Sequence, residues 1–407
     1  MAADDFRIIA SNTRLSDNLK RVYPADLDNV YMPGFDLLNS IPKKIVAEGD
    51  SIRKGVKLSA IGGFSAGTIG ESSDYKRAQT NYNLKNFFQK ILLDYNTVKR
   101  SDSSVEAFQN FMKEAISDAR LDVLANQNRM LFGNADSLLG TISAVSTVGS
   151  VHTCTISDYN RTKLIKGSIV EVVTGTTERD VTFKITQIDH ENSKAELTAI
   201  SGAYTPVVND VIYIQNGYHA TTVNDWVGLK KALSATSGTL YGVTVQDGWG
   251  SYNLSAASAR ISMSLLRQCF YEHKAKEHTN VDVVVMGPLQ MRLLEDQLEA
   301  QLTDTVLDLQ GVSSKAGRPV RGLKIGGEVI PILVDDAMPN NEVWFLNRSK
   351  MALERQSEGE FIPGTEGMLH YQGINSGRHE YAMLWAQRSE LFIDPRHQAR
   401  LHTLATS

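Results

Sequence analysis

The chain has 407 residues, more than a single hydrophobic core usually supports, so two or three domains are expected. Its 42% hydrophobic and 22% charged residues are ordinary for a globular protein and argue against overall disorder. A formal net charge of -4 excludes the basic excess that grips many DNA phosphates, so any nucleic acid nearby is expected to be enclosed rather than read.

Residues 1–50 are expected to form an arm that orders against a partner. Charged side chains interrupt its apolar positions, and Pro24, Pro33 and Pro42 break any long helix. The first residues include acids and no apolar core segment, and no window of the chain approaches the ~20 apolar residues of a membrane span. We therefore expect a soluble protein made in a cytoplasm.

Residues 51–100 are expected to form an extended loop. Val56 to Ile61 alternates as one strand, and Phe87 to Val98 is the predicted return strand of a hairpin, with glycines loosening the path between them. The polar tip is expected from Ser72 to Asn81. Such a loop is too long for a hairpin turn and needs a neighbour to pack on.

Charged residues near the tip of this loop are the candidate functional residues, as inter-subunit contacts. They are Glu71, Asp74, Lys76 and Arg77. They can form ion pairs across a neighbour, although a merely solvated turn explains them equally well. Exposed pairs contribute only ~0–1 kcal/mol each, so strength must come from repetition and from apolar burial. The apolar residues expected to supply it are Phe87, Phe88, Ile91 and Leu92.

A long helix is predicted from about Ser104 to Leu131. Ser103 followed by Glu106 fits a capping box, and Gly133 lies past the end. Apolar residues recur at three- and four-residue steps, so one face is buried along about 40 Å at ~1.5 Å per residue. These residues are Val105, Phe108, Met112, Ala115, Ile116, Ala119, Leu124 and Leu131.

Residues 150–216 are predicted to form a small closed β-barrel inserted into a loop. Short strands parted by polar turns are expected at 169–173, 181–186, 195–200 and 211–214. The flanking segments, 143–149 and 217–222, are mostly small and polar, as an inserted domain requires.

The remainder is predicted to form a mixed α/β layer followed by strands. Helices are expected at 255–273 and 289–302, on either side of a buried strand at 281–286. Closing strands are expected at 328–334, 343–346 and 381–385. The fold class is therefore α+β.

Segments that partly match known catalytic motifs lack either the required spacing or the required structural context. The segment from Gly62 to Gly67 has no P-loop lysine and no dinucleotide fingerprint. Gly63 to Gly67 matches Gly-x-Ser-x-Gly literally, but no helix follows Ser65, as a nucleophile elbow needs. We therefore predict that the chain has no catalytic residue, binds no cofactor and is not an enzyme.

Metal patterns are equally weak. No histidine pair has the i, i+4 spacing and interposed Glu of a zinc peptidase, and Cys154 and Cys269 match no metal or redox spacing. The pairs considered are His152 with Cys154, His273 with His278, and His397 with His402. A divalent ion at Asp335 and Asp336, or at Glu354 with Glu358 and Glu360, is the alternative to solvated acidic turns. We predict no metal site.

In their order, these segments resemble the major capsid proteins of tailed bacteriophages, which have the Hong Kong 97 fold. Four stretches resemble that family: LFGNADSLLGTI (131–142), GTLYGVTVQDGWG (238–250), VDVVVMGPLQMRLLEDQ (281–297) and GEVIPILVDDAMPNNEVWFLNRSKMALERQ (327–356). The resemblance implies an N-terminal arm (1–50), an extended loop on the neighbouring subunit (51–100) and an axial domain (217–345). It also implies a peripheral domain (101–149 and 346–407) with spine helix 103–132. The barrel (150–216) departs from the minimal fold.

The function implied is structural: subunits assemble as hexamers and pentamers into an icosahedral virion head that encloses double-stranded DNA without sequence-specific binding. A separate scaffolding protein, a portal and a decoration protein are the implied partners, and assembly is expected in the host cytoplasm, with no membrane. One alternative is an encapsulin-like bacterial compartment. Another is a glycan-binding or adhesive surface protein that uses aromatic residues of the barrel: Tyr159, Tyr204, Tyr213 and Tyr218.

Overall fold

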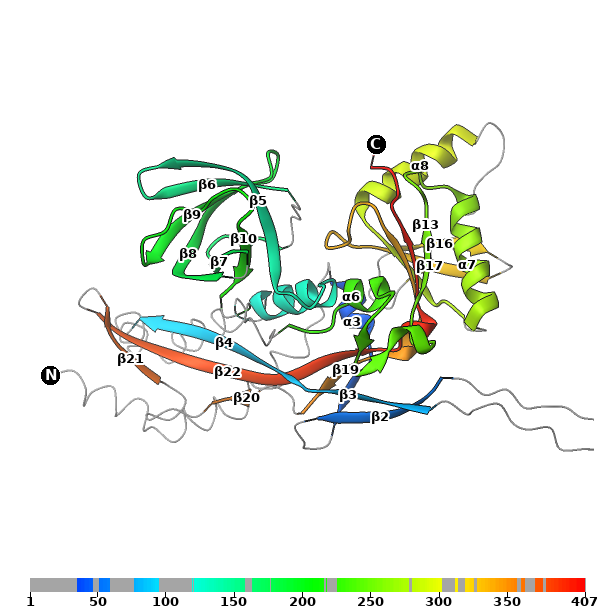
Figure 1. The fold of residues 1–407 in the computed structure, drawn as a ribbon, viewed down its shortest axis with the longest axis horizontal. Helices are drawn as coiled ribbons and strands as arrows, with labels where there is room; N and C mark the ends of the chain where they lie inside the picture. Colours follow the sequence, from blue (N-terminus) through cyan, green and yellow to red (C-terminus); the bar gives the residue numbers. More distant parts are fainter. Residues whose placement is uncertain are drawn as a thin grey trace, which may run out of the picture.

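The computed structural model describes residues 35–46, 51–58, 77–94, 119, 121–157, 163–175, 177–215, 217, 225–277, 280–301, 312–313, 319–325, 328–356, 360–362, 370–375 and 378–406. A long sheet forms the base of the molecule, and a barrel and a sheet covered by helices stand on the same side of it (Figure 1). The chain is a mixed α+β protein, as the sequence predicts. Among the described residues, no helix has the length and apolar character to cross a membrane.

The base sheet is built around the long strand β22 (Arg378–Ile393). β4 (Lys85–Asp94) pairs with it antiparallel along one edge. Along the other edge lie β21 (His370–Asn375), β20 (Glu360–Phe361) and β19 (Met351–Arg355), and β1 (Lys43–Ile45) pairs parallel with β19. The sheet thus joins the beginning of the described chain to its end.

The predicted hairpin between residues 56–61 and 87–98 is wrong. β2 (Ile52–Lys57) pairs instead with β3 (Arg77–Tyr82) in a separate two-stranded sheet. Residues 87–94 of the strand predicted as the return belong to β4 and pair with β22. The alternating pattern shows which side chains share a face, but it does not identify the partner strand, and the true partner, β3, is mostly polar.

The apolar residues of β4 pack within their own subunit. The Phe87 ring meets the buried Trp385 ring edge-on, with centroids 6.1 Å apart, and Ile91 is buried. Phe88 faces the opposite way and is 62% exposed. Leu92 pairs with Ala382 along the same ladder. Phe88 therefore keeps the exposure that a contact with a neighbour needs.

The second sheet contains seven strands in the described part of the chain. Their order is β13 (Tyr252–Ser255), β23 (Ala399–His402), β18 (Val343–Leu346), β14 (Val283–Met286), β17 (Glu328–Val334), β16 (Pro319–Ile325) and β15 (Val312–Ser313). α7 (Met263–Glu277) and α8 (Pro288–Gln301) pack on one face. The strands predicted at 328–334 and 343–346 are confirmed to the residue.

β14 shows how this sheet separates two cores. Val284 and Met286 point to the helices α7 and α8, whereas Val283 and Val285 point to the opposite core. That opposite core lies between the two sheets and also contains short elements. These are α3 (Asp36–Ser40), α6 (Leu229–Ser234), β11 (Thr239–Leu240), β12 (Val243–Thr244) and η1 (Val245–Asp247). Two further 3-10 turns, η2 (Arg348–Lys350) and η3 (Pro395–His397), flank the closing strands.

The helix predicted at 255–273 begins later than expected. Residues 252–255 form β13, and Ala257 and Ser258 adopt left-handed backbone conformations with φ of 49° and 63°. The helix α7 starts at Met263, where the Ser262 hydroxyl accepts a hydrogen bond from the Leu265 N–H at 3.3 Å. The first residue of α7 is therefore set by the N-cap at Ser262 and not by the apolar pattern that precedes it.

The barrel is closed and contains six strands among the described residues, in the order β10, β5, β6, β9, β8, β7. These are β5 (Leu138–Val148), β6 (Val151–Ile156), β7 (Ile169–Thr174), β8 (Thr177–Asp189), β9 (Lys194–Ser201) and β10 (Val211–Ile214). The expected start at residue 150 is wrong because the small, polar stretch 143–149 is mostly strand. Only one side of β5 faces the core, so half of its residues can be polar.

The described end of the long helix spans 121–131, with Ala119 also helical. Val123, Leu124 and Leu131 are buried, and the helix stops just before Gly133, as predicted. The predicted capping box at Ser103 and Glu106 lies outside the described residues. The helix end packs into the core between the two sheets, where Phe132 stacks on Trp344 with ring centroids 5.6 Å apart.

Candidate assembly site at the root of the extended hairpin

The hairpin formed by β2 and β3 has one face on the body of the molecule and one face in solvent. Val56, Thr80 and Tyr82 are buried, and Ile52 and Ala78 pack against the same core. The opposite face carries cations and no carboxylate of these two strands: Arg53, Lys57 and Arg77. Lys57 and Arg77 are direct cross-strand partners.

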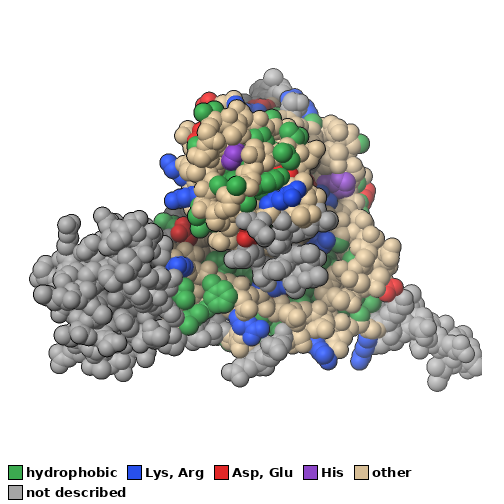
Figure 2. All heavy atoms as spheres, turned by 60° about the vertical axis from the view of Figure 1, so that its left-hand side comes forward, with side chains coloured by type: hydrophobic (Ala, Val, Ile, Leu, Met, Phe, Trp, Pro, Cys, Tyr) green, Lys and Arg blue, Asp and Glu red, His purple; other side chains and the backbone are tan. Residues whose placement is uncertain are grey.

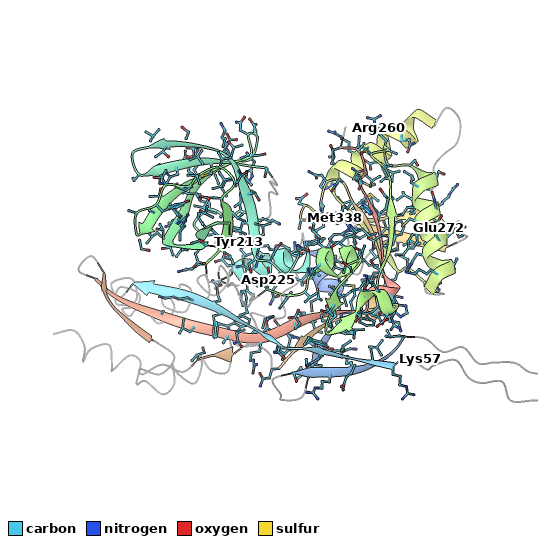
Figure 3. All side chains as sticks on the ribbon, viewed as in Figure 1. Lys57, Tyr213, Asp225, Arg260, Glu272 and Met338 are labelled. Atoms are coloured by element: carbon cyan, nitrogen blue, oxygen red, sulfur yellow. The ribbon has the colours of Figure 1, made fainter. Side chains whose placement is uncertain are left out.

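This cationic face lies along the lower edge of the molecule. Figure 3 shows Lys57 at the end of the hairpin, pointing away from the body. Figure 2 shows Lys and Arg side chains along the lower margin of the described atoms. Like charges placed directly opposite on a hairpin oppose its folding, so the pair does not itself stabilise the hairpin.

Lys54 fixes the inner face of the hairpin to the base sheet. Its ammonium group forms an ion pair with the buried carboxylate of Glu354 in β19 and lies 3.8 Å from the centre of the Phe392 ring. The Tyr82 hydroxyl donates a hydrogen bond to the other Glu354 oxygen at 2.5 Å. Glu354 therefore receives one donor from each strand of the hairpin.

Aromatic rings complete this junction. Tyr82 stacks on Phe392 with centroids 5.5 Å apart and meets Tyr241 edge-on at 5.2 Å. The Tyr241 hydroxyl donates to the Leu391 carbonyl at 2.7 Å. Burial raises the pKa of both tyrosines well above their usual range, so both hydroxyls stay protonated and act as donors.

A second contact holds the outer end of the hairpin. The Arg396 Nη1 donates to the Lys57 carbonyl at 2.7 Å, while its Nη2 pairs with Asp394 at 2.7 Å. The guanidinium also lies 4.9 Å from the Trp249 ring centre. The hairpin is thus tied to the body at two points along β2, through the Lys54 side chain and the Lys57 carbonyl.

The end of the long helix is tied to separate parts of the chain by consecutive polar residues. Gln127 donates to Gln387 in β22 at 3.1 Å, and Asn128 hydrogen-bonds Asp335 after β17. Arg129 pairs with Asp225 at 3.1 Å, and both side chains are almost fully buried. Figure 3 shows Asp225 at the centre of the molecule, beside this helix. The helix end is therefore hydrogen-bonded both to the base sheet and to the end of a strand of the second sheet.

Of the four predicted tip residues, the structure describes one, Arg77. Glu71, Asp74 and Lys76 lie outside the described residues. Arg77 is the first residue of β3 and lies on the exposed face, not at a turn. The polar tip expected to extend to Asn81 is therefore shorter, because 77–82 is strand.

Residues of the hairpin root were missed by the sequence analysis. Lys54 and Glu354 are 300 positions apart, and neither has a distinctive neighbourhood in the sequence. The sequence predicts that Glu354 lies in a solvated acidic turn or binds an ion, whereas it is 1% exposed and holds Lys54 and Tyr82. One signal for this site was available in the sequence. The alternating pattern of β2 places Lys54 on the same face as the apolar residues Ile52 and Val56.

The histidine, cysteine and tyrosine candidates described in the barrel are held by contacts within the barrel itself. His152 and Cys154 both lie inside the barrel, where His152 Nδ1 is 3.0 Å from the Thr147 hydroxyl. Burial raises the pKa of the Cys154 thiol to about 12. The Tyr204 hydroxyl donates to buried Asp210 at 2.8 Å, so this ring is held by the barrel. Tyr159 and Tyr218 lie outside the described residues.

Within the described part of the chain, no group of three or more His, Cys, Asp or Glu side chains is arranged to hold a metal ion. Asp335 is buried, and burial raises its pKa to about 6. Its carboxylate accepts the Ala337 N–H at 2.8 Å, so it caps a turn and is not the solvated acid expected from the sequence.

The chain was compared with known proteins. No protein-family model and no curated protein matches it. Among solved structures, the cyanophage A-1(L) capsid asymmetric unit matches with a TM-score of 0.53 and 12% identity, over 93% of this chain and 95% of that one.

Two further structures match less well. The capsid of the native GTA particle has a TM-score of 0.47 and 11% identity, covering 93% and 92% of the two chains. The holo-SrpI encapsulin complex from Synechococcus elongatus PCC 7942 has a TM-score of 0.43 and 9% identity, covering 94% of each. The likeness to the cyanophage capsid shows that this chain has a phage-capsid fold, and the resemblance predicted from the sequence is confirmed at that level.

Proposed function

We propose that the chain is a structural major capsid protein that assembles as hexamers and pentamers into an icosahedral head enclosing double-stranded DNA. The observation that carries the proposal is the match to a phage capsid over 93% of the chain. The firmly docked hairpin root supports it, because a loop that lies on a neighbour needs a rigid base. Weak contacts are then multiplied by symmetry.

In this proposal the segments have the roles that the resemblance implies. Residues 1–50 are the arm, 51–100 the extended loop, and 101–149 with 346–407 the peripheral domain; 217–345 are the axial domain. The barrel is a peripheral addition, with its boundary moved to residue 138. A scaffolding protein, a portal and a decoration protein are the proposed partners, and shells assemble in the host cytoplasm.

The test is to express the full chain, alone and with a candidate scaffolding protein, and to examine it by negative-stain electron microscopy and sedimentation. We expect closed shells, or hexameric and pentameric rings. A chain that stays monomeric under all these conditions contradicts the proposal. Shells that pack an enzyme in place of DNA would instead indicate a compartment.

The loop tip is the proposed contact between subunits, through Glu71, Asp74, Lys76 and Arg77. Replacing Lys76 and Arg77 together by Glu is expected to raise the protein concentration needed for assembly at least severalfold, because each lost pair recurs in every subunit. The matched control reverses Lys166 and Lys184 on the barrel. If both double variants assemble like the parent in a light-scattering titration, the tip does not make the contact.

A further inference from the structure

Two glutamates face each other beneath the docked hairpin. Glu354 in β19 and Glu390 in β22 are direct partners in the antiparallel register, and each is 1% exposed. Directly opposite side chains leave an antiparallel sheet on the same face, with Cβ atoms about 4.5–5.5 Å apart. Two buried negative charges at this spacing repel, so the pair favours a state in which one carboxyl group is neutral.

The two carboxyl groups have different partners. Glu354 receives Lys54 and Tyr82 from the hairpin. Glu390 receives backbone N–H groups, from Val227 at 2.8 Å and Leu391 at 3.2 Å, through the same oxygen. The cation that the hairpin brings to this site is therefore bound to Glu354, and Glu390 is the member of the pair that can hold a proton.

Other groups around Glu390 decide its charge. Burial is the largest influence and raises its pKa to about 8; Asp225 also disfavours the charged form, while Lys85 and the two N–H groups favour it. Tyr82 and Tyr241 lie close enough to sense the charge of Glu390, and both remain neutral. The groups that face Glu390 from the elements around it are Glu354, Lys85, Asp225, Tyr82 and Tyr241.

We propose that the proton on Glu390 controls how firmly the hairpin root is docked on the body. While Glu390 is neutral, Lys54 and Glu354 hold the hairpin closed as a simple ion pair. Opening the hairpin uncovers the facing carboxyl groups, so Glu390 is hydrated and releases its proton. Opening is therefore favoured by rising pH. This property belongs to the single subunit and goes beyond the shell function, so it can fail or hold independently of assembly.

The pH window follows from the direction of the shift. A carboxyl group with a raised pKa in the closed state binds its proton more tightly there than in the open state. The closed state is fully favoured below the ordinary pKa of about 4.5 and loses that advantage as pH rises towards 8. Between these limits the opening equilibrium changes by up to about tenfold for each pH unit.

The test measures hydrogen exchange of the amides in β2 and β3 for the full-length chain and its Glu390→Gln variant. Both proteins are compared at pH 5.5 and again at pH 7.5, because comparison at one pH cancels the intrinsic change in exchange rate. We expect hairpin exchange to be faster in the parent than in the variant already at pH 5.5, and the ratio of the two rates to rise further by up to about tenfold per pH unit towards pH 7.5. Equal protection at both pH values overturns the proposal.

Further variants separate this effect from general loosening. Lys54→Met is expected to speed hairpin exchange at both pH values, while Glu191→Gln on an exposed barrel turn leaves it unchanged. If the Glu390→Gln variant does not fold, the proposal is tested with the parent protein alone. Its hairpin exchange rate, divided by that of the barrel strand β9, must rise between pH 5.5 and 7.5, and a flat ratio contradicts the proposal.

Discussion

His273 shows at the residue scale how burial converts an ordinary side chain into a pH-sensitive one. It lies on α7 with 0% exposure, and burial lowers its pKa to about 4; a hydrogen bond with the His397 backbone opposes this shift, while the charges of His397 and Lys276 add to it. A histidine with a lowered pKa binds more protons in the unfolded chain than in the folded one. Its contribution to stability is therefore present at neutral pH and is lost as pH falls from about 6.5 to 4.

Replacing His273 by Leu, which is apolar and of similar size, is expected to remove this dependence. Between pH 7 and pH 4.5 the parent should lose about 2–3 kcal/mol more stability than the variant, from the pKa difference at 1.36 kcal/mol per unit. Thermal unfolding followed by circular dichroism at several pH values measures this. His190→Leu on an exposed barrel turn is the control. Parallel stability curves for parent and His273→Leu would refute the assignment.

At the scale of elements, the sequence predicts individual strands better than their partners. β10, β17 and β18 coincide with their expected ranges because each is a short apolar run between clear turns. The partner of β2 was wrong because alternation defines a face, and the partner is chosen by distant packing. The hairpin root was missed for the same reason, since Lys54 and Glu354 meet only in the folded chain.

The approach of α6 to the end of the long helix gives an element-scale prediction. A Cβ atom at Gly228 would lie 2.4 Å from the backbone oxygens of Gly133 and Met130, which cannot move independently of the helix. Gly228→Ala is therefore expected to destabilise the protein by at least about 2 kcal/mol through overpacking. Gly55→Ala, where nothing lies within 4 Å, is the control. Denaturant titration of both variants is the measurement, and equal midpoints would contradict the expected clash.

At the scale of the whole molecule, the barrel is a unit with its own core. Its buried residues contact one another around Phe183 and Ile185, and β5 and β10 close the ring. The sequence identified this unit from its short strands, yet placed its start twelve residues late. The error came from composition, because β5 has polar residues on its outer side.

Two deletions test this boundary. Replacing 138–214 by a short Gly-Ser linker removes the closed barrel and is expected to leave a soluble chain. Replacing 150–216 leaves β5 without β6 and β10, and its open edge is expected to cause aggregation. Size-exclusion chromatography distinguishes the two products. If both behave alike, β5 is not needed to close the barrel.

The length of β22 has a mechanical consequence. In an antiparallel ladder the hydrogen bonds run across the strands, so tension along β22 would load its pairs with β4 together, in shear, and not one at a time. The same strand is joined to β19, β20 and β21 along its other edge. Stretching along this axis would therefore meet far greater resistance than peeling at either end of the strand.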